Sequence, residues 1–397
     1  MRELSVPTDS KIVLLVLDGL GGLPNEHGRT ELEAANTPNL DSLAARSDLG
    51  LSRPVTAGVS PGSGPGHLGL FGYDPLEYEV GRGVLSALGV GFELGQNDLA
   101  ARINFATKDE SGRISDRRAG RISTEEASKL VDLLNEDIEL DGAEVFVVHE
   151  KEHRAVAVFR AKGLSDALSD SDPQRVGLEP LPVKPTDGAS DASKKSAALA
   201  NAFIEQADDI LADRHPANTV LLRGFGMHPA LPEFDEVYKL HAAAIAGYPM
   251  YKGLARLAGM EVLKEGEGIA GELATLRESW EPYDFFFIHI KATDAAGEDG
   301  DPGRKSAVIE EVDALVPDLL DLGPDALAVT GDHATPAKME SHSWHGVPFL
   351  LSSPYTLPTA ESFGERVCAG GSLGVFSSEE IMGLLMGHAL KLNRYGA

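Results

Sequence analysis

Short apolar segments alternate with amphipathic segments along most of the chain. The apolar segments are rich in β-branched or aromatic residues, so they predict strands over residues 12–17, 219–222, 284–290, 326–330 and 347–351. The segments between them predict helices over residues 191–211, 250–257, 307–320 and 378–392. Because strands that alternate with helices are typical of a mainly parallel sheet flanked by helices, the pattern predicts the α/β class.

The middle of the chain has a different order of elements. Strands are predicted over residues 99–107, 143–149 and 154–159, around one helix over residues 124–134. Two successive strands indicate an antiparallel pair in a small inserted α+β domain. The stretch "SDSDPQRVGLEPLPVKPTDGAS" that follows is typical of a hinge, because it is rich in Pro, Asp and Ser. We therefore expect a core domain over residues 1–97 and 187–397, and an inserted cap domain over residues 98–186.

Composition narrows the class of protein. The 397 residues are 42% hydrophobic, and they contain no apolar run of the roughly 18 residues that would span a bilayer. Residues 1–10 are too polar for a signal peptide, and the single cysteine, Cys368, fits a reducing compartment. The net charge of -27 argues against nucleic-acid or membrane partners. We expect a cytoplasmic protein, and the oligomeric state stays open.

Metal-ligand side chains follow three of the predicted strands. Asp18 ends "IVLLVLDGLGG", Asp332 and His333 end "ALAVTGDHATP", and "FFFIHIKATDAAGEDGD" carries several further carboxylates. His342 and His345 come just before another strand. Each motif alone also fits a turn, a helix cap or a solvated loop. Together they predict a hydrolytic or phosphoryl-transfer centre with Mn²⁺, Mg²⁺ or Zn²⁺, because carboxylates and imidazoles without thiolates suit these ions.

A glycine-rich segment, "SPGSGPGHLGLFGYDP" at residues 60–75, carries two candidate nucleophiles, Ser60 and Ser63. It is not a P-loop, because the Gly-Lys-Ser/Thr ending is missing and we do not expect it to open a helix directly. The glycines would free the backbone to present a serine to a metal ion and would leave space for a phosphoryl group.

Several segments, read in chain order, resemble the cofactor-independent (2,3-bisphosphoglycerate-independent) phosphoglycerate mutases. The resemblance is to the shorter archaeal-type branch of the alkaline phosphatase superfamily, and it covers most of the chain. Besides "LDGLGG", the segments are "ANTPNLDSLA", "GYDPLEYEVGRGVLSALG", "DRRAGRI", "LLRGFG", "AAAIAGYPMYKGLARLAGMEV", "HIKATDAAGEDGD" and "VTGDHATP". The resemblance implies an alkaline-phosphatase-like sheet with an inserted domain, which agrees with the pattern of strands and helices.

The resemblance also implies the site residues. Ser63 would be the nucleophile that takes a phosphoryl group from the substrate and returns it. Two divalent ions, Mn²⁺ first among them, would be held by two sets of ligands: Asp18, Ser63, Asp332 and His333 in one set, and Asp294, Glu298 and His342 in the other. His342 is preferred to His345 because the family's histidine lies six residues before the proline of its "VP" pair. Glu298 stands where the family usually has a histidine.

The expected substrate is a small phosphorylated metabolite, and the resemblance nominates residues that would bind it: His67, Arg82, Arg117, Arg118, Arg223 and Lys252. The activity implied is the interconversion of 3-phosphoglycerate and 2-phosphoglycerate through phosphoserine, in glycolysis and gluconeogenesis. One alternative is a phosphatase, phosphomutase or phosphotransferase acting on another metabolite, for example a homoserine kinase-like enzyme, and Glu298 keeps it open. Another is a binding protein without catalysis.

Overall fold

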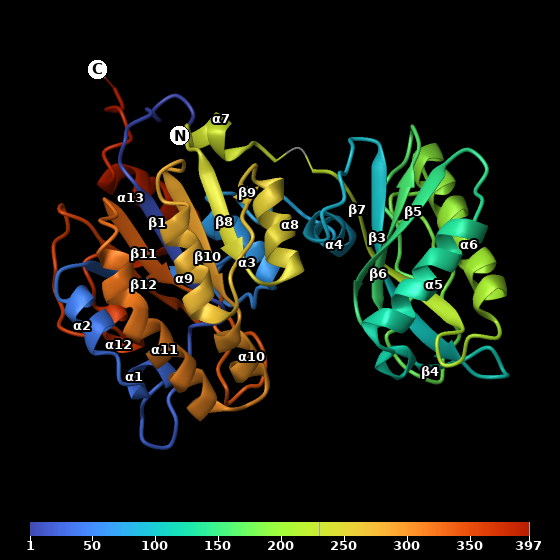
Figure 1. Ribbon diagram of the computed structural model, residues 1–397, viewed down its shortest axis with the longest axis horizontal. Helices are drawn as coiled ribbons and strands as arrows, with labels where there is room; N and C mark the ends of the chain where they lie inside the picture. Colours follow the sequence, from blue (N-terminus) through green and yellow to red (C-terminus); the bar gives the residue numbers. More distant parts are fainter. Residues whose placement is uncertain (230, 397) are drawn as a thin grey trace. The chain divides into compact units, whose positions relative to one another are not determined.

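The chain forms two compact units in a computed structural model that describes residues 1–229 and 231–396. Unit 1 comprises Met1–Glu79 and Leu231–Ala397, and unit 2 comprises Val80–Ala230 (Figure 1). Unit 2 is therefore inserted into the sequence of unit 1. Each unit has its own sheet.

Unit 1 contains an eight-stranded sheet with the order β13-β2-β12-β11-β1-β10-β8-β9. The strands are β1 (Ile12–Leu17), β2 (Asp48–Arg53), β8 (Ala242–Ala246), β9 (Glu261–Val262), β10 (Phe285–Ile290), β11 (Ala326–Thr330), β12 (Val347–Ser352) and β13 (Gly374–Ser377). The neighbours from β11 to β9 all pair in parallel, whereas β12 runs antiparallel to both β11 and β2. The predicted mainly parallel α/β sheet is confirmed.

The central strands are buried along their whole length. Every residue of β1 and of β10 is buried, as expected of parallel strands covered on both faces. Val13 and Leu15 on one face of β1 belong to the same apolar cluster as Val312 and Val316 of helix α11. Figure 1 shows α9 and α11 in front of this sheet.

The last helix of unit 1 ends earlier in the chain than predicted. The helices are α1 (Glu31–Ala34), α2 (Pro38–Ala44), α3 (Ser63–Leu70), α7 (Phe234–Tyr238), α8 (Pro249–Leu257), α9 (Gly268–Glu278), α10 (Ala292–Glu298), α11 (Pro302–Leu320), α12 (Glu365–Ala369), the 3₁₀ turn η2 (Ser378–Glu380) and α13 (Ile381–His388). The helix predicted over residues 378–392 stops at His388, because Leu390 adopts a left-handed conformation with φ of 54°.

Unit 2 is built on an antiparallel sheet. Its elements are α4 (Arg82–Gly89), β3 (Asp98–Lys108), β4 (Ile114–Asp116), η1 (Ala119–Arg121), α5 (Thr124–Asp137), β5 (Glu144–Lys151), β6 (Arg154–Arg160), α6 (Asp191–Leu211) and β7 (Thr219–Met227). The long strand β3 pairs antiparallel with β4, β6 and β7, and β5 pairs with β6.

The boundaries of unit 2 differ from the predicted insertion over residues 98–186. Helix α6 and strand β7, which we assigned to the core domain, belong to unit 2. The physical reason is that β7 pairs with β3 from Ala106↔Thr219 to Leu99↔Met227, while α6 buries Phe203 against Phe159 of the same sheet.

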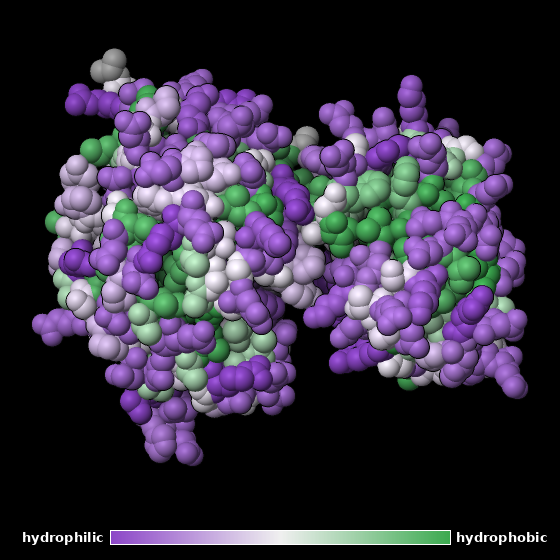
Figure 2. Space-filling model, in the orientation of Figure 1, coloured by the Kyte–Doolittle hydropathy of each residue, from purple (hydrophilic) through white to green (hydrophobic). Residues whose placement is uncertain are grey.

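Polar residues cover much of the surface, in keeping with the acidic composition. Figure 2 shows hydrophilic side chains over most of the visible face of each unit. Among the helices of the described residues, none combines the length and the apolar character needed to cross a membrane.

Candidate active site

The predicted metal ligands gather because three strands of unit 1 end at one edge of the sheet. Strand β1 pairs in parallel with β10 and with β11, in the registers Leu17↔Ile290 and Val16↔Thr330. The residues that follow these strands therefore emerge side by side, as is usual for ligand sites at the carboxyl ends of parallel strands. Asp18, Asp294 and Asp332 all lie at this edge, and all three are fully buried.

Asp18, Asp332 and His333 form the first ligand cluster, with Ser63 beside it. The Nε2 atom of His333 lies 3.3 Å from Oδ1 of Asp18, 3.2 Å from Oδ2 of Asp332 and 3.3 Å from Oγ of Ser63. Within residues 1–229 and 231–396, neither of these two carboxylate oxygens has a hydrogen-bond partner. Because unpaired buried carboxylate oxygens are costly, their convergence on a histidine nitrogen and a serine hydroxyl fits a divalent cation.

Thr335 fixes the orientation of the His333 ring. Its hydroxyl donates to Oδ1 of Asp294 at 2.6 Å, since an ionised carboxylate can only accept. The same hydroxyl oxygen lies 3.0 Å from Nδ1 of His333 and must accept there, so Nδ1 carries the proton. The lone pair of His333 is then on Nε2, which faces the three oxygen atoms of the first cluster. This is the arrangement in which a second partner holds a metal-binding imidazole.

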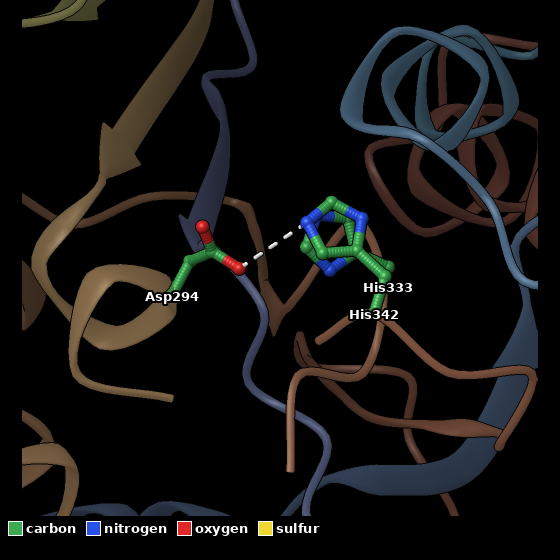
Figure 3. Close-up of side chains that lie close together, drawn as sticks. All are labelled: Asp294, His333 and His342. Carbon is green, nitrogen blue, oxygen red and sulfur yellow. Dashed lines mark ion pairs between the residues drawn. The ribbon is translucent and has the colours of Figure 1, made fainter. Parts of the chain in front are cut away.

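The second ligand cluster contains Asp294, His342 and the ring of His333. Figure 3 shows the two imidazole rings lying one over the other, with the Asp294 carboxylate facing His342; the ring centroids are 3.7 Å apart. Nδ1 of His342 donates to the main-chain oxygen of Pro61 at 2.9 Å, so its Nε2 lone pair points at Oδ1 of Asp294, 3.6 Å away.

Glu298 joins the second cluster from the same helix as Asp294. The two residues are four positions apart on α10, so their side chains share one face. The carboxylate of Glu298 lies 3.7 Å from Nε2 of His342, and about half of the side chain is exposed. The structure thus brings together all three residues predicted for the second ion. His345 lies apart, with Nδ1 3.0 Å from the Ser343 hydroxyl.

The glycine-rich segment does open a helix, contrary to our expectation. Ser63 is the first residue of α3, after the cap residue Gly62. A Cβ atom at Gly66 would lie only 2.5 Å from the main-chain oxygen of Asp332, so glycine is needed for α3 to approach the first cluster.

His67 lies in the protein interior, next to Ser63 and Asp332 of the first ligand cluster. The ring is fully buried, with Nδ1 2.8 Å from the main-chain oxygen of Ser63 and 3.2 Å from Oδ2 of Asp332. This position suits a residue that orients Ser63 and Asp332, and a contact between His67 and the substrate stays a prediction.

Lys291 brings positive charge to the clusters and Tyr251 a hydrogen bond, and neither was predicted as a site residue. The Lys291 ammonium lies 3.1 Å from Oδ2 of Asp18 and 2.5 Å from Oδ2 of Asp294. Tyr251 donates to the same oxygen of Asp18 at 2.5 Å. Burial alone would raise the pKa of Asp18, but His289, His333 and Lys291 together hold it well below 3.8. Only the position of Lys291, three residues before Asp294, hinted at this role.

Four predicted substrate-binding residues, Arg82, Arg117, Arg118 and Arg223, line one cavity of about 200 Å³ in unit 2. The remaining lining residues are Arg102, Asn104, His153 and Arg154. Asp172 offsets part of the positive charge, with its carboxylate 2.6 Å from Arg117 and 3.4 Å from Arg223. Burial and the nearby guanidinium groups of Arg223 and Arg102 lower the pKa of Arg82. A pocket with this excess of guanidinium groups suits a phosphate or a carboxylate.

Lys252, the other residue nominated for substrate, belongs to α8 of unit 1. Its ammonium lies 2.8 Å from a carboxylate oxygen of Glu265. Lys252 is not among the residues that line the arginine-lined cavity, and its role in binding substrate stays a prediction.

Comparison with known proteins gives a consistent picture. A family model for 2,3-bisphosphoglycerate-independent phosphoglycerate mutase matches residues 44–218. Proteins of Thermosipho africanus and Thermus thermophilus, each described as a "probable 2,3-bisphosphoglycerate-independent phosphoglycerate mutase", are 51% and 53% identical over all of this chain and 98% of their own length.

Two solved structures share the fold over nearly the whole chain. A protein from Pyrococcus horikoshii is 31% identical with a TM-score of 0.84, covering 98% of this chain and all of its own. A cofactor-independent phosphoglycerate mutase from Thermoplasma acidophilum is 34% identical with a TM-score of 0.74, covering 96% of this chain and all of its own. The resemblance noted in the sequence is confirmed, and the chain belongs to the 2,3-bisphosphoglycerate-independent phosphoglycerate mutase family.

Proposed function

We propose that this chain interconverts 3-phosphoglycerate and 2-phosphoglycerate through a phosphoserine at Ser63, as an enzyme of glycolysis and gluconeogenesis. The names of relatives about 50% identical over the full length support the activity. One observation carries the mechanism: Oγ of Ser63 lies 3.3 Å from Nε2 of His333, which also faces Oδ1 of Asp18, a buried oxygen without a hydrogen-bond donor among the described residues.

The two clusters would hold two divalent ions. Asp18, Ser63, Asp332 and His333 would bind one ion, and Asp294, Glu298 and His342 would bind the other. Bound ions supply positive charge that lowers the pKa of the serine hydroxyl and offsets charge on the phosphoryl group. We propose Mn²⁺, because carboxylate oxygens and imidazole nitrogens, without thiolates, suit this ion; Mg²⁺ and Zn²⁺ are the alternatives.

The chain's own groups account for the transfer. Oγ of Ser63 gives up its proton and forms a bond to the phosphorus atom, while the bond from phosphorus to the glycerate oxygen breaks and that oxygen takes up a proton. In the return step the other glycerate hydroxyl gives up its proton and bonds to the phosphorus atom, while the bond from phosphorus to Oγ of Ser63 breaks and Oγ takes up a proton. Because glycerate, and not water, accepts the phosphoryl group from Ser63 in the return step, the reaction releases no free phosphate.

The arginine-lined cavity of unit 2 would bind an anionic group of the substrate. Phosphoglycerate carries a phosphate and a carboxylate, and guanidinium groups bind both in a bidentate manner. His153 is uncharged near neutral pH, because burial and then the adjacent Arg154 lower its pKa to about 4. The arginines therefore provide the charge, and we propose Arg82, Arg117, Arg118 and Arg223 as substrate ligands.

A coupled assay tests the proposed function. Purified protein with added Mn²⁺ receives 3-phosphoglycerate, and 2-phosphoglycerate and free phosphate are measured in the same sample. Formation of 2-phosphoglycerate without phosphate supports the mutase. Release of phosphate alone would support a phosphatase, and activity that persists in excess chelator would contradict the metal centre.

The nucleophile is tested in the same assay by Ser63→Ala, with Ser60→Ala as the matched control in the same glycine-rich segment. Ser63→Ala should abolish turnover and leave the circular dichroism spectrum unchanged, because it removes one hydroxyl from a partly exposed position. Ser60→Ala should keep full activity. Turnover close to wild type in Ser63→Ala would refute the phosphoserine.

A further inference from the structure

Lys305 is a fully buried lysine beneath the ligand clusters, and none of the proposed steps uses it. It belongs to α11, and its side chain is 0% exposed. The ammonium donates to three main-chain oxygens, those of Gly19 at 2.8 Å, Gly21 at 3.0 Å and Thr335 at 2.9 Å. All three ammonium hydrogens therefore have a partner.

The three carbonyl groups belong to the two loops that carry the first cluster. Gly19 and Gly21 follow Asp18, whereas Thr335 follows Asp332 and His333. The amide of Thr335 also donates to the oxygens of Gly19 and Gly21, at 3.2 Å and 3.0 Å. The ammonium thus reinforces a direct contact between the loops and ties both of them to α11.

Two carboxylates, those of the buried Glu31 and the partly buried Glu365, act on Lys305 through their charge and bind the same loops. An oxygen of Glu365 accepts from the amide of Gly22 at 2.9 Å, and an oxygen of Glu31 accepts from the amide of Ala337 at 2.8 Å. Burial lowers the pKa of Lys305, and the carboxylates of Glu31 and Glu365 oppose this shift. A buried ammonium without such compensation would be costly, so the negative charge of these carboxylates helps to keep Lys305 charged under the two loops.

We propose that Lys305 is a positioning residue that holds the loops after β1 and β11 in their ligand-binding geometry before a metal ion arrives. The inference rests on the proposed function, because it assumes that the cluster of Asp18, Asp332 and His333 binds a metal ion. Holding ligands in place beforehand lowers the ordering cost of binding, so metal affinity is the property that Lys305 should control.

The test measures Mn²⁺ affinity of the metal-free, full-length protein by isothermal titration calorimetry. Lys305→Met removes the three donors but keeps most of the side-chain volume, and we expect binding to weaken by about tenfold or more. Two control lysines lie away from the clusters. Lys11 donates to the oxygens of Trp280, Glu281 and Tyr283, and the buried Lys391 donates to Thr8 and Asp284.

The two controls separate positioning from general stability. Like Lys305→Met, the Lys11→Met change removes three hydrogen bonds to main-chain oxygens. Lys391→Met likewise removes a buried ammonium group. Both control changes should therefore lower the melting temperature. We expect each control to change Mn²⁺ affinity less than about threefold, at a temperature where circular dichroism shows every variant folded. Equal affinity of Lys305→Met and wild type would overturn the inference alone. A wild type that binds no Mn²⁺ would overturn the proposed metal centre and the inference with it.

A second measurement needs no variant and applies even if Lys305→Met fails to fold. Hydrogen exchange of the metal-free wild type is followed in peptides that cover residues 18–22 and 332–336. These amides should exchange within about twofold of their rates with Mn²⁺ bound, because Lys305 already holds the loops. Exchange that is about tenfold faster without Mn²⁺ would show that the ion orders the loops, and would overturn the inference.

Discussion

Replacing Thr335 with valine should weaken metal binding without disturbing the packing of the core. The Thr335 side chain is fully buried, and valine has the same branched shape. The change removes the hydroxyl that donates to Asp294 at 2.6 Å and accepts from Nδ1 of His333 at 3.0 Å. The His333 proton then has no acceptor at Nδ1, so the ring can carry its proton on Nε2, where the ligand lone pair is needed.

The size of the effect follows from the lost hydrogen bonds. A hydrogen bond to a charged group contributes roughly 1.5–3 kcal/mol, and about 1.4 kcal/mol corresponds to a tenfold change in an equilibrium constant. A loss of about 2 kcal/mol predicts roughly 30-fold weaker Mn²⁺ binding. Because Asp294 belongs to one cluster and His333 contacts both, neither cluster should retain its affinity.

Calorimetric titration with Mn²⁺ and the mutase assay at increasing Mn²⁺ concentration provide the measurements. Thr219→Val is the matched control, since the buried Thr219 hydroxyl of unit 2 also donates to a carboxylate, that of Asp208 at 2.6 Å, and Asp208 is not a proposed ligand. We expect Thr219→Val to change Mn²⁺ affinity less than about threefold. A Thr335→Val protein that binds Mn²⁺ as tightly as the wild type would refute the assignment of the His333 tautomer and of Nε2 as the ligand atom.

Three further predictions follow from charge and burial. Arg82→Gln should raise KM for phosphoglycerate about tenfold or more, without lowering the melting temperature, because it relieves crowding of guanidinium groups; unchanged KM in steady-state kinetics would contradict this. Glu298→Ala should raise the Mn²⁺ concentration for half-maximal activity less than Asp294→Ala does, because Glu298 is half exposed. A larger increase for Glu298→Ala than for Asp294→Ala would contradict this ranking of the two ligands. Burial and then Glu265 raise the pKa of Glu272 to about 8 from 4.5, so stability should fall by about 1.4 kcal/mol per pH unit between these values; urea titrations of Glu272→Gln should lack this slope.

Much of the core sheet could be predicted because its strands are apolar runs that end at polar residues. Strands β1 and β11 have the predicted bounds, Ile12–Leu17 and Ala326–Thr330. Strand β8 was missed, because Ala242–Ala246 reads "AAAIA" and alanine favours helices. It forms a strand because it pairs with β10 inside the buried sheet, where tertiary context overrides local preference.

The allocation of elements to the two units depended on contacts that the pattern does not contain. Strand β7 is as apolar at Thr219–Leu222 as the strands of the core sheet, so its sequence does not tell which sheet it joins. Pairing with β3, more than a hundred residues earlier, decides the matter.

The ligand residues could be nominated from their positions after strands and from family resemblance, and the geometry brings them together. The residues that support these ligands could not be predicted from the sequence. Thr335, Lys291 and Lys305 act through hydrogen bonds to ligand atoms or to loop carbonyls, and those partners become visible only once the strand ends are aligned. The burial of His67 was likewise not evident from its place four residues after Ser63.

The insertion of unit 2 into unit 1 has a consequence for how the protein is made. On the ribosome, Asp18 and Ser63 emerge before unit 2, whereas Asp294, Asp332 and His333 emerge after it. Unit 2 is continuous in sequence and can complete its sheet while the rest is still being synthesised. During that interval β1 has neither of its neighbours, β10 and β11, so its apolar residues stay exposed. Until β10 and β11 have been synthesised, these exposed apolar residues of β1 can contact other nascent chains. This stage of synthesis is therefore prone to aggregation.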